Sequence, residues 1–174
     1  EMKQQKVHFV ILNDHDVCNL TNEEVSLFHK NNLSVLKAIE FTTKEGVHII
    51  GVHEKIKSLE SKHLYYGADL INKLKVLGAR IILPHPEHLT GIFGAERSTP
   101  SLIEKAVKSA DAFEVNNYRY GKTSTQLVKK IKSLNIFHLT FLRASRVHFG
   151  CIFIKFIYPR FTFCRYPMTI CINS

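Results

Sequence analysis

The sequence lacks a long apolar segment. It contains no run of about 18 uncharged apolar residues, the length that a membrane-spanning helix needs. Residues 1–6 are polar and lack the charged and apolar regions of a signal peptide. Hydrophobic residues make up 45% of the 174 residues and charged residues 22%, as is ordinary for a soluble globular protein. We therefore expect a cytoplasmic chain without a transmembrane segment, long enough to bury one sizeable core.

Carboxylates are absent from the last part of the chain. Residues 140–174 hold five arginines or lysines and no acidic residue, so they carry +5 of the net charge of +9. The preceding 139 residues carry the remaining +4. A basic tail attracts phosphate without sequence specificity, so we expect no specific nucleic-acid partner. The alternative is a nucleic-acid-binding protein whose Arg- and Phe-rich tail contacts phosphates and stacks on bases.

The cysteines form no recognised metal-binding pattern. Cys151, Cys164 and Cys171 are separated by 13 and 7 positions, which matches no zinc finger, and Cys18 lies far from them. We interpret all four as free thiols of a cytosolic protein.

The chain changes composition near Leu139. The residues beyond it include six of the twelve phenylalanines and three of the four cysteines. One interpretation is a tail that binds a membrane surface or a partner. The other is a sequence unrelated to the fold, such as a frameshift would produce, and it accounts better for an apolar, acid-free end on a balanced domain. We divide the chain into a domain at 1–141 and an atypical tail at 142–174.

Strands and helices alternate along the first part of the chain. Thr21 and Glu24 have the spacing of a capping box, and Gly78 is placed to end a helix. The patterns predict strands at 6–12, 33–41, 47–52, 79–83, 110–115 and from 135, and helices at 21–31, 61–77, 100–108 and 124–133. The second and third strands form a hairpin, and residues 13–16 form a polar loop. This order favours an α/β fold with a largely parallel sheet or a barrel.

Polar side chains gather where the predicted strands end. His15, Glu40 and His85 each follow or finish a strand, and the strand at 110–115 ends with Glu114, Asn116 and Asn117. Chemistry gathers at the carboxyl ends of strands in such folds. Imidazole and carboxylate groups suit zinc, manganese or iron. A single histidine in a loop is more often a hydrogen-bonding residue, so the site is expected from the shared placement of these residues at strand ends and not from any one of them.

Five segments resemble motifs of the PHP (polymerase and histidinol phosphatase) superfamily, in the family's order. Segment 10–16 (VILNDHD) is similar to the family's TDHD segment, with Asn13 in place of threonine, and segment 38–41 (AIEF) to its G-x-E strand end. The other three are segments 45–51 (EGVHIIG), 78–86 (GARIILPHP) and 110–117 (ADAFEVNN). The short span between the hairpin and the His-Pro motif resembles the small stand-alone phosphoesterases.

The resemblance implies a distorted (β/α)7 barrel with a metal site at the carboxyl ends of its strands. By position, it implies metal contacts from His15, Glu40, His48 and His85, of which His15, Glu40 and His85 are the candidate catalytic residues. The implied cofactors are divalent Mn, Zn or Fe ions. The implied activity is hydrolysis of a small phosphorylated substrate, a phosphomonoester or nucleotide-like compound, by metal-activated hydroxide. His53 and His88 are candidates for supporting positions. Arg97 and Arg119 could contact phosphate, or could be ordinary surface residues.

The chain departs from the family at both ends. We find no His-x-His segment before residue 10, and residues 142–145 (LRAS) stand where the family has Ser-Asp-x-His. We therefore expect an incomplete barrel without its first strand, and a catalytically inactive binding or structural module is an alternative function. The missing strand would expose a sheet edge, which the apolar tail could cover or which could promote self-association.

Overall fold

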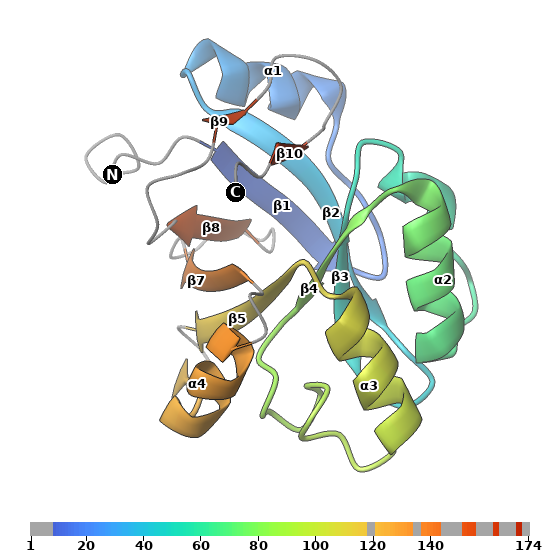
Figure 1. The fold of residues 1–174 in the computed structure, drawn as a ribbon. Coiled ribbons are helices and arrows are strands. Elements are labelled where there is room, and N and C mark those ends of the chain that lie inside the picture. The colour runs from blue at the N-terminus through green and yellow to red at the C-terminus, as the bar shows by residue number, and fades with distance from the viewer. Residues whose placement is uncertain are drawn as a thin grey trace.

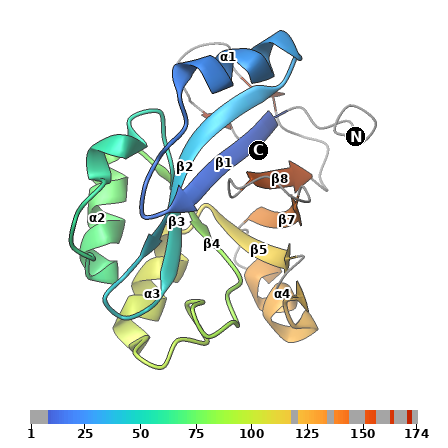
Figure 2. The same ribbon diagram turned by 180° about the vertical axis from the view of Figure 1, so that it is seen from behind.

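A computed structural model describes residues 9–117, 121–133, 137–143, 151–155, 162–163 and 170–171. Strands lie at the centre and helices pack around them, as Figures 1 and 2 show from opposite sides. The α/β class expected from the sequence is confirmed. The predicted elements occur in the predicted order up to the strand at Phe137–Arg143, with a short helix at Ile56–Leu59 and a short strand at Gly121–Lys122 in addition. In the described part of the chain, no helix is both long and apolar enough to cross a membrane.

The helices are α1 (Asn22–Lys30), α2 (Gly67–Leu77), α3 (Pro100–Ser109) and α4 (Thr125–Ser133), with a 3-10 helix η2 at Ile56–Leu59. The strands are β1 (Phe9–His15), β2 (Ser34–Thr42), β3 (His48–Val52), β4 (Arg80–Leu83), β5 (Ala112–Asn117), β6 (Gly121–Lys122), β7 (Phe137–Arg143), β8 (Cys151–Lys155), β9 (Thr162–Phe163) and β10 (Ile170–Cys171).

The main sheet is mixed rather than largely parallel. Its strand order is β4-β3-β2-β1-β8-β7-β5-β6. Because β4 also pairs with β5, the strands from β4 to β5 in this order form a closed ring. The pairs β1–β2, β4–β5 and β5–β7 are parallel, whereas β2–β3, β3–β4, β7–β8 and β1–β8 are antiparallel. The uniform βα alternation of a (β/α)7 barrel is therefore not what the pairings show.

The first strand runs further than the sequence pattern predicts. Residues 13–15 belong to β1, where we expected a polar loop, because β1 pairs with β2 along its whole length up to His15 opposite Glu40. Polar residues are tolerated in this strand because Asn13 and His15 lie on the face that points into the ring, as described below. The polar composition of residues 13–15 therefore did not mark the start of a loop.

The helix ends agree with the capping residues in the sequence, except at the start of α2. The Thr21 side chain accepts a hydrogen bond from the Glu24 N–H and the Glu24 side chain accepts from the Thr21 N–H, which confirms the capping box. Gly78 ends α2 in the left-handed conformation at φ +74°, also as predicted. Helix α2 begins at Gly67 and not near residue 61, and the Glu45 carboxylate accepts a hydrogen bond from the Gly67 N–H at that new start.

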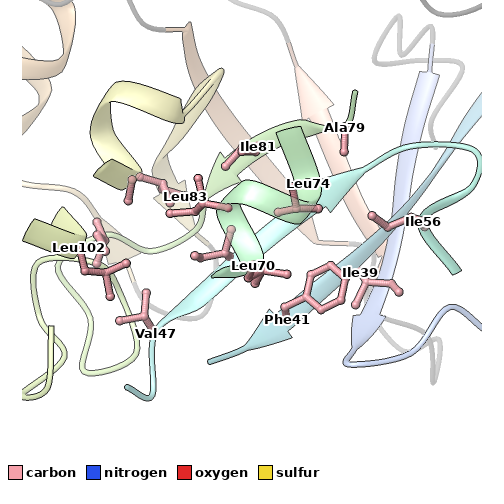
Figure 3. Close-up of a cluster of buried hydrophobic side chains, with 14 of the residues drawn as sticks. Ile39, Phe41, Val47, Ile56, Leu70, Leu74, Ala79, Ile81, Leu83 and Leu102 are labelled. Atoms are coloured by element: carbon pink, nitrogen blue, oxygen red, sulfur yellow. The ribbon is translucent and has the colours of Figure 1, made fainter. Parts of the chain in front are cut away.

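Two apolar clusters lie on the two faces of the sheet. The larger one packs α2 and α3 against the outer face, and Figure 3 shows its side chains, among them Ile39, Leu74, Ile81 and Leu83. The smaller cluster belongs to the inner face of the ring. Its buried members are Ile11, Ala38, Ile50, Val52, Ile82 and Ala112. Neighbouring residues of one strand supply both clusters, as the alternation of side chains along a strand requires.

The last strands bear on the expected tail. Strand β8 pairs with β1 at Val10–Leu12, so it covers the edge of β1 that we expected the tail to cover. The boundary drawn at residues 141 and 142 falls inside β7, which pairs with both β5 and β8. The division into domain and tail stays a prediction.

Candidate metal centre

The polar residues at one end of the ring continue the inner face. Side chains two positions apart on a strand point to the same side. Asn13 follows Ile11 at that spacing, Glu40 follows Ala38, and Glu114 follows Ala112; His48 precedes Ile50 by two. The inner apolar cluster therefore fills the ring directly beneath a polar layer. We call this end the site end.

Three ligand atoms meet at the centre of the site end. The Glu40 Oε1 atom lies 3.0 Å from His48 Nδ1 and 3.3 Å from His85 Nε2. The two ring nitrogens lie 3.3 Å from each other. Side-chain exposure is only 13% for Glu40, 12% for His48 and 3% for His85, so the group is largely shielded from water.

His15 forms a second group of three potential ligands, together with Glu40 and His48 of the first group. Ligand atoms of His15, Glu40 and His48 all lie within 4.8 Å of one another. The His15 ring is 5.0 Å from that of His48, and its side chain is exposed. Glu40 and His48 thus belong to both sets, with buried His85 on one side and exposed His15 on the other.

The hydrogen bonds at Glu40 determine its charge. Burial alone would raise the pKa of Glu40, but hydrogen bonds with His48 and His85 and the charge of His15 and His48 hold that pKa well below its ordinary value. The Glu40 side chain is therefore a carboxylate at neutral pH. Its second oxygen, Oε2, accepts a hydrogen bond of 3.0 Å from Asn13 Nδ2, which fixes the plane of the carboxylate.

Backbone contacts hold the ends of β1, β2 and β3 together. The Asp16 N–H donates to the Glu40 carbonyl at 3.1 Å, and Asp16 Oδ1 accepts from the Thr42 N–H at 2.6 Å. The His48 N–H donates to the Thr90 carbonyl at 2.7 Å. These contacts place His15, Glu40 and His48 at one level.

The loop after β4 is a compact turn that leaves no room for larger residues at two glycines. A Cβ atom on Gly91 would collide with the His85 carbonyl, and one on Gly94 would collide with the His88 carbonyl. The same loop carries His88, whose ring lies 5.5 Å from that of His85 and whose Nδ1 lies 3.2 Å from Thr90 Oγ1. One tightly coiled loop therefore supports both His85 and His48.

The ligand spacing fits a bound divalent cation. Nitrogen and oxygen ligands about 2.1 Å from a tetrahedral cation lie about 3.4 Å apart, and at octahedral right angles about 3.0 Å apart. The separations of 3.0–3.3 Å among Glu40, His48 and His85 fall in this range. Asn13 Oδ1 is moreover buried with no hydrogen-bond partner among the described residues. The donor set suits zinc, manganese or iron and does not select one of them.

Comparison with solved structures identifies the fold. No family model matches the chain, and no curated protein matches it in sequence. A Bifidobacterium adolescentis protein inferred to be a metal-dependent phosphoesterase matches with a TM-score of 0.60 and 12% identity, over 80% of this chain and 78% of that one. A two-domain Bacteroides vulgatus protein, inferred to contain a PHP-like metal-dependent phosphoesterase, matches with a TM-score of 0.55 and 17% identity. The fold is PHP-like. The match to the Bacteroides protein spans 75% of this chain and only 41% of that protein.

The PHP-like fold brings together all four residues named from the sequence. His15, Glu40, His48 and His85 lie at one site, and their roles there remain to be tested. His53 does not join them: it follows β3 at the opposite end, where its N–H donates to the Lys37 carbonyl.

Other candidates have mixed outcomes. Arg97 is an exposed residue of the loop before α3, and Arg119 lies outside the described residues, as do the side chains of Asn116 and Asn117. Sequence reasoning missed Asn13 as a contact of Glu40, although its departure from the family's threonine drew attention to the position. It placed Glu114 at a strand end without giving it a role.

Proposed function

We propose that the chain is a metal-dependent phosphoesterase-type domain that hydrolyses phosphomonoesters or nucleotide-like substrates. The observation that carries the proposal is the group of Glu40 Oε1, His48 Nδ1 and His85 Nε2, spaced at 3.0–3.3 Å like ligands of one cation. The PHP-like fold supports it, because the proteins with this fold named above are inferred to be metal-dependent phosphoesterases.

The residues of this chain would bind and orient the cation, and the cation would act as a Lewis acid. Glu40, His48 and His85 would hold a divalent ion, and His15 with Glu40 and His48 would offer a second, overlapping position. Such an ion activates water and polarises a phosphoryl oxygen. The apolar cluster beneath the polar layer closes the ring on one side, so the substrate would arrive at the side of exposed His15.

The test is metal-dependent turnover with a matched pair of histidine variants. The full chain is stripped with a chelator, reloaded with Mn²⁺, Zn²⁺ or Fe²⁺, and assayed on an aryl phosphate. We expect turnover that requires the metal, is lost in His85→Ala and is retained in His53→Ala, since His53 lies at the opposite end of β3. A chain that binds no metal and turns over no substrate would refute the proposal.

A second candidate is a metal-binding module of the same fold without hydrolysis. The observation that favours it is that the potential ligands all come from neighbouring strands on one side of the ring. Among the residues whose side chains are described, the ligands come from β1, β2, β3 and the loop after β4, while the position beside β1 is occupied by antiparallel β8. Stoichiometric metal without turnover on aryl phosphates or nucleotides would favour this function over the first.

A further inference from the structure

A buried carboxylate lies behind His85 and has no role in the proposed chemistry. Glu114 is 1% exposed and stands on β5, one residue beyond the last β4–β5 pair, Leu83 opposite Phe113. Its Oε2 atom accepts a hydrogen bond of 2.5 Å from the His85 N–H. Burying a carboxylate is costly unless hydrogen bonds or nearby charges offset its lost hydration, so its place in the core calls for a reason.

The end of the β4–β5 ladder explains why a side chain is needed there. Alternate backbone N–H groups of a strand face the same neighbouring strand, and those of Ile81 and His85 both face β5. The last backbone pair of this ladder is Leu83 opposite Phe113, so the His85 N–H lies beyond it, and the Glu114 carboxylate accepts its hydrogen bond in place of a backbone carbonyl. Hydrogen bonds to a charged acceptor are shorter and stronger than neutral ones.

The backbone of His85 needs such a restraint. Its φ angle is +28°, outside the regions that residues with a side chain ordinarily occupy. A conformation of this kind persists only when surrounding contacts hold it, and it is often found at functional sites. At this φ the ring is directed to Glu40 and His48, each 3.3 Å from His85 Nε2.

We propose that Glu114 is a positioning residue that fixes His85 in its ligating conformation and thereby sets the affinity of the site for a divalent cation. The inference rests on the metal-binding part of the proposed function and not on hydrolysis. Glutamine at position 114 could still accept the His85 N–H but would carry no charge. Leucine would fill similar space and accept nothing.

A matched control exists on the same two strands. At the other end of β4, Asp111 Oδ2 accepts a hydrogen bond of 2.8 Å from the Ile81 N–H. This is the same kind of bond, donated by a backbone N–H of β4 to a carboxylate next to β5, but it lies away from the site end. Asp111→Leu should disturb the pairing of these strands without moving His85.

The first experiment measures cation affinity by competition with a chelating dye, using Zn²⁺ and Mn²⁺ alone as probes. We expect roughly 10- to 100-fold weaker binding in Glu114→Leu, the range for residues that orient a ligand. Glu114→Gln should lose less, and Asp111→Leu should bind as the wild type does. In a His85→Ala background, Glu114→Leu should cause no further loss.

The second experiment needs neither metal nor activity. Diethyl pyrocarbonate labels accessible histidines, and His85, whose side chain is 3% exposed, should react slowly in the metal-free wild type. We expect faster labelling of His85 in Glu114→Leu, with His53 unchanged as an internal reference. Should Glu114→Leu fail to fold, Glu114→Gln undergoes the same two measurements, with smaller effects in the same direction.

Two results would overturn the proposal. One is a folded Glu114 variant with wild-type cation affinity and wild-type labelling of His85. The other is an equal loss of affinity from Glu114→Leu with and without His85, because Glu114 would then act on the cation directly. A chain that binds metal but hydrolyses nothing would refute the proposed hydrolysis and leave the Glu114 proposal standing or falling on these data. A chain that binds no metal would count against both.

Discussion

Strands β4 and β5 carry a carboxylate bonded to a backbone N–H at each end, and the two ends differ in what surrounds that bond. At the far end, Asp111 also contacts the Arg80 guanidinium at 2.8 Å, and both side chains are about one third exposed. At the site end, Glu114 is buried, and the nearby Glu40 carboxylate contacts two imidazoles. An arginine is always charged, whereas an imidazole is charged only when it is protonated.

The two ends differ in how the charge of the carboxylates is balanced. Arg80 and Asp111 satisfy each other and need no further charge. Glu40, His48 and His85 converge as three potential electron-pair donors, an arrangement that a divalent cation stabilises. The β4–β5 pair thus has a balanced ion pair at one end, and at the other end the loop after β4 brings His85 to Glu40 and His48.

The largest effect should come from Phe113, the buried core residue that lies between Asp111 and Glu114 along the chain. Phe113 is fully buried between Ala112 and Glu114, on the opposite face of β5, and its ring stacks on Phe93. Phe113→Ala should lower the free energy of unfolding by about 3–5 kcal/mol. Denaturant titration measures it, with Val76→Ala as the exposed control. A loss below about 1 kcal/mol would contradict the packing described here.

Next in size is the removal of the shared ligand at the site end. Glu40→Gln should weaken Zn²⁺ or Mn²⁺ binding by more than about 100-fold, beyond the range expected of an orienting residue. Glu104→Gln is the control, because Glu104 is an exposed partner of Lys108 on α3. Competition titration compares the two, and similar affinities would remove the distinction between the ends.

A smaller effect should appear in the pH dependence of the metal-free chain. The pKa of Glu40 is lower in the folded protein than its ordinary value of 4.5. Its contribution to stability is therefore fully present above pH about 4.5 and is lost as the pH falls below that value. Unfolding measured from pH 6 to pH 3 should show a steeper loss for the wild type than for Glu40→Gln. Parallel curves would mean that Glu40 is not held as a carboxylate.

The smallest effect should come from the far end. Arg80→Met removes a partly exposed ion pair, which is worth about 0–1 kcal/mol of stability. Cation affinity should not change, since Arg80 lies at the start of β4 and His85 beyond its end. Thermal unfolding and dye competition on the same sample test both statements. A clear loss of cation affinity would show that the two ends are coupled.

Local features of the sequence predicted more than long-range ones did. The capping box at Thr21, the left-handed Gly78 and the order of elements follow from nearby residues, and the structure has them. The structure also brings the strand-end residues His15, Glu40 and His85 close together, while their roles stay predictions. The ring of mixed strands could not be predicted, because pairing of β8 with β1 depends on contacts about 140 residues apart. The role of the Asn13 amide likewise depends on Glu40, 27 residues away.

The most direct test of the account is the position of the metal. Crystals of the full chain soaked in Zn²⁺ or Mn²⁺ would be measured at the absorption edge of that metal. We expect an anomalous peak about 2.0–2.3 Å from Glu40 Oε1, His48 Nδ1 and His85 Nε2. A chain whose crystals show no peak among these atoms, or a peak only elsewhere, would contradict the assignment of the site end as a metal centre.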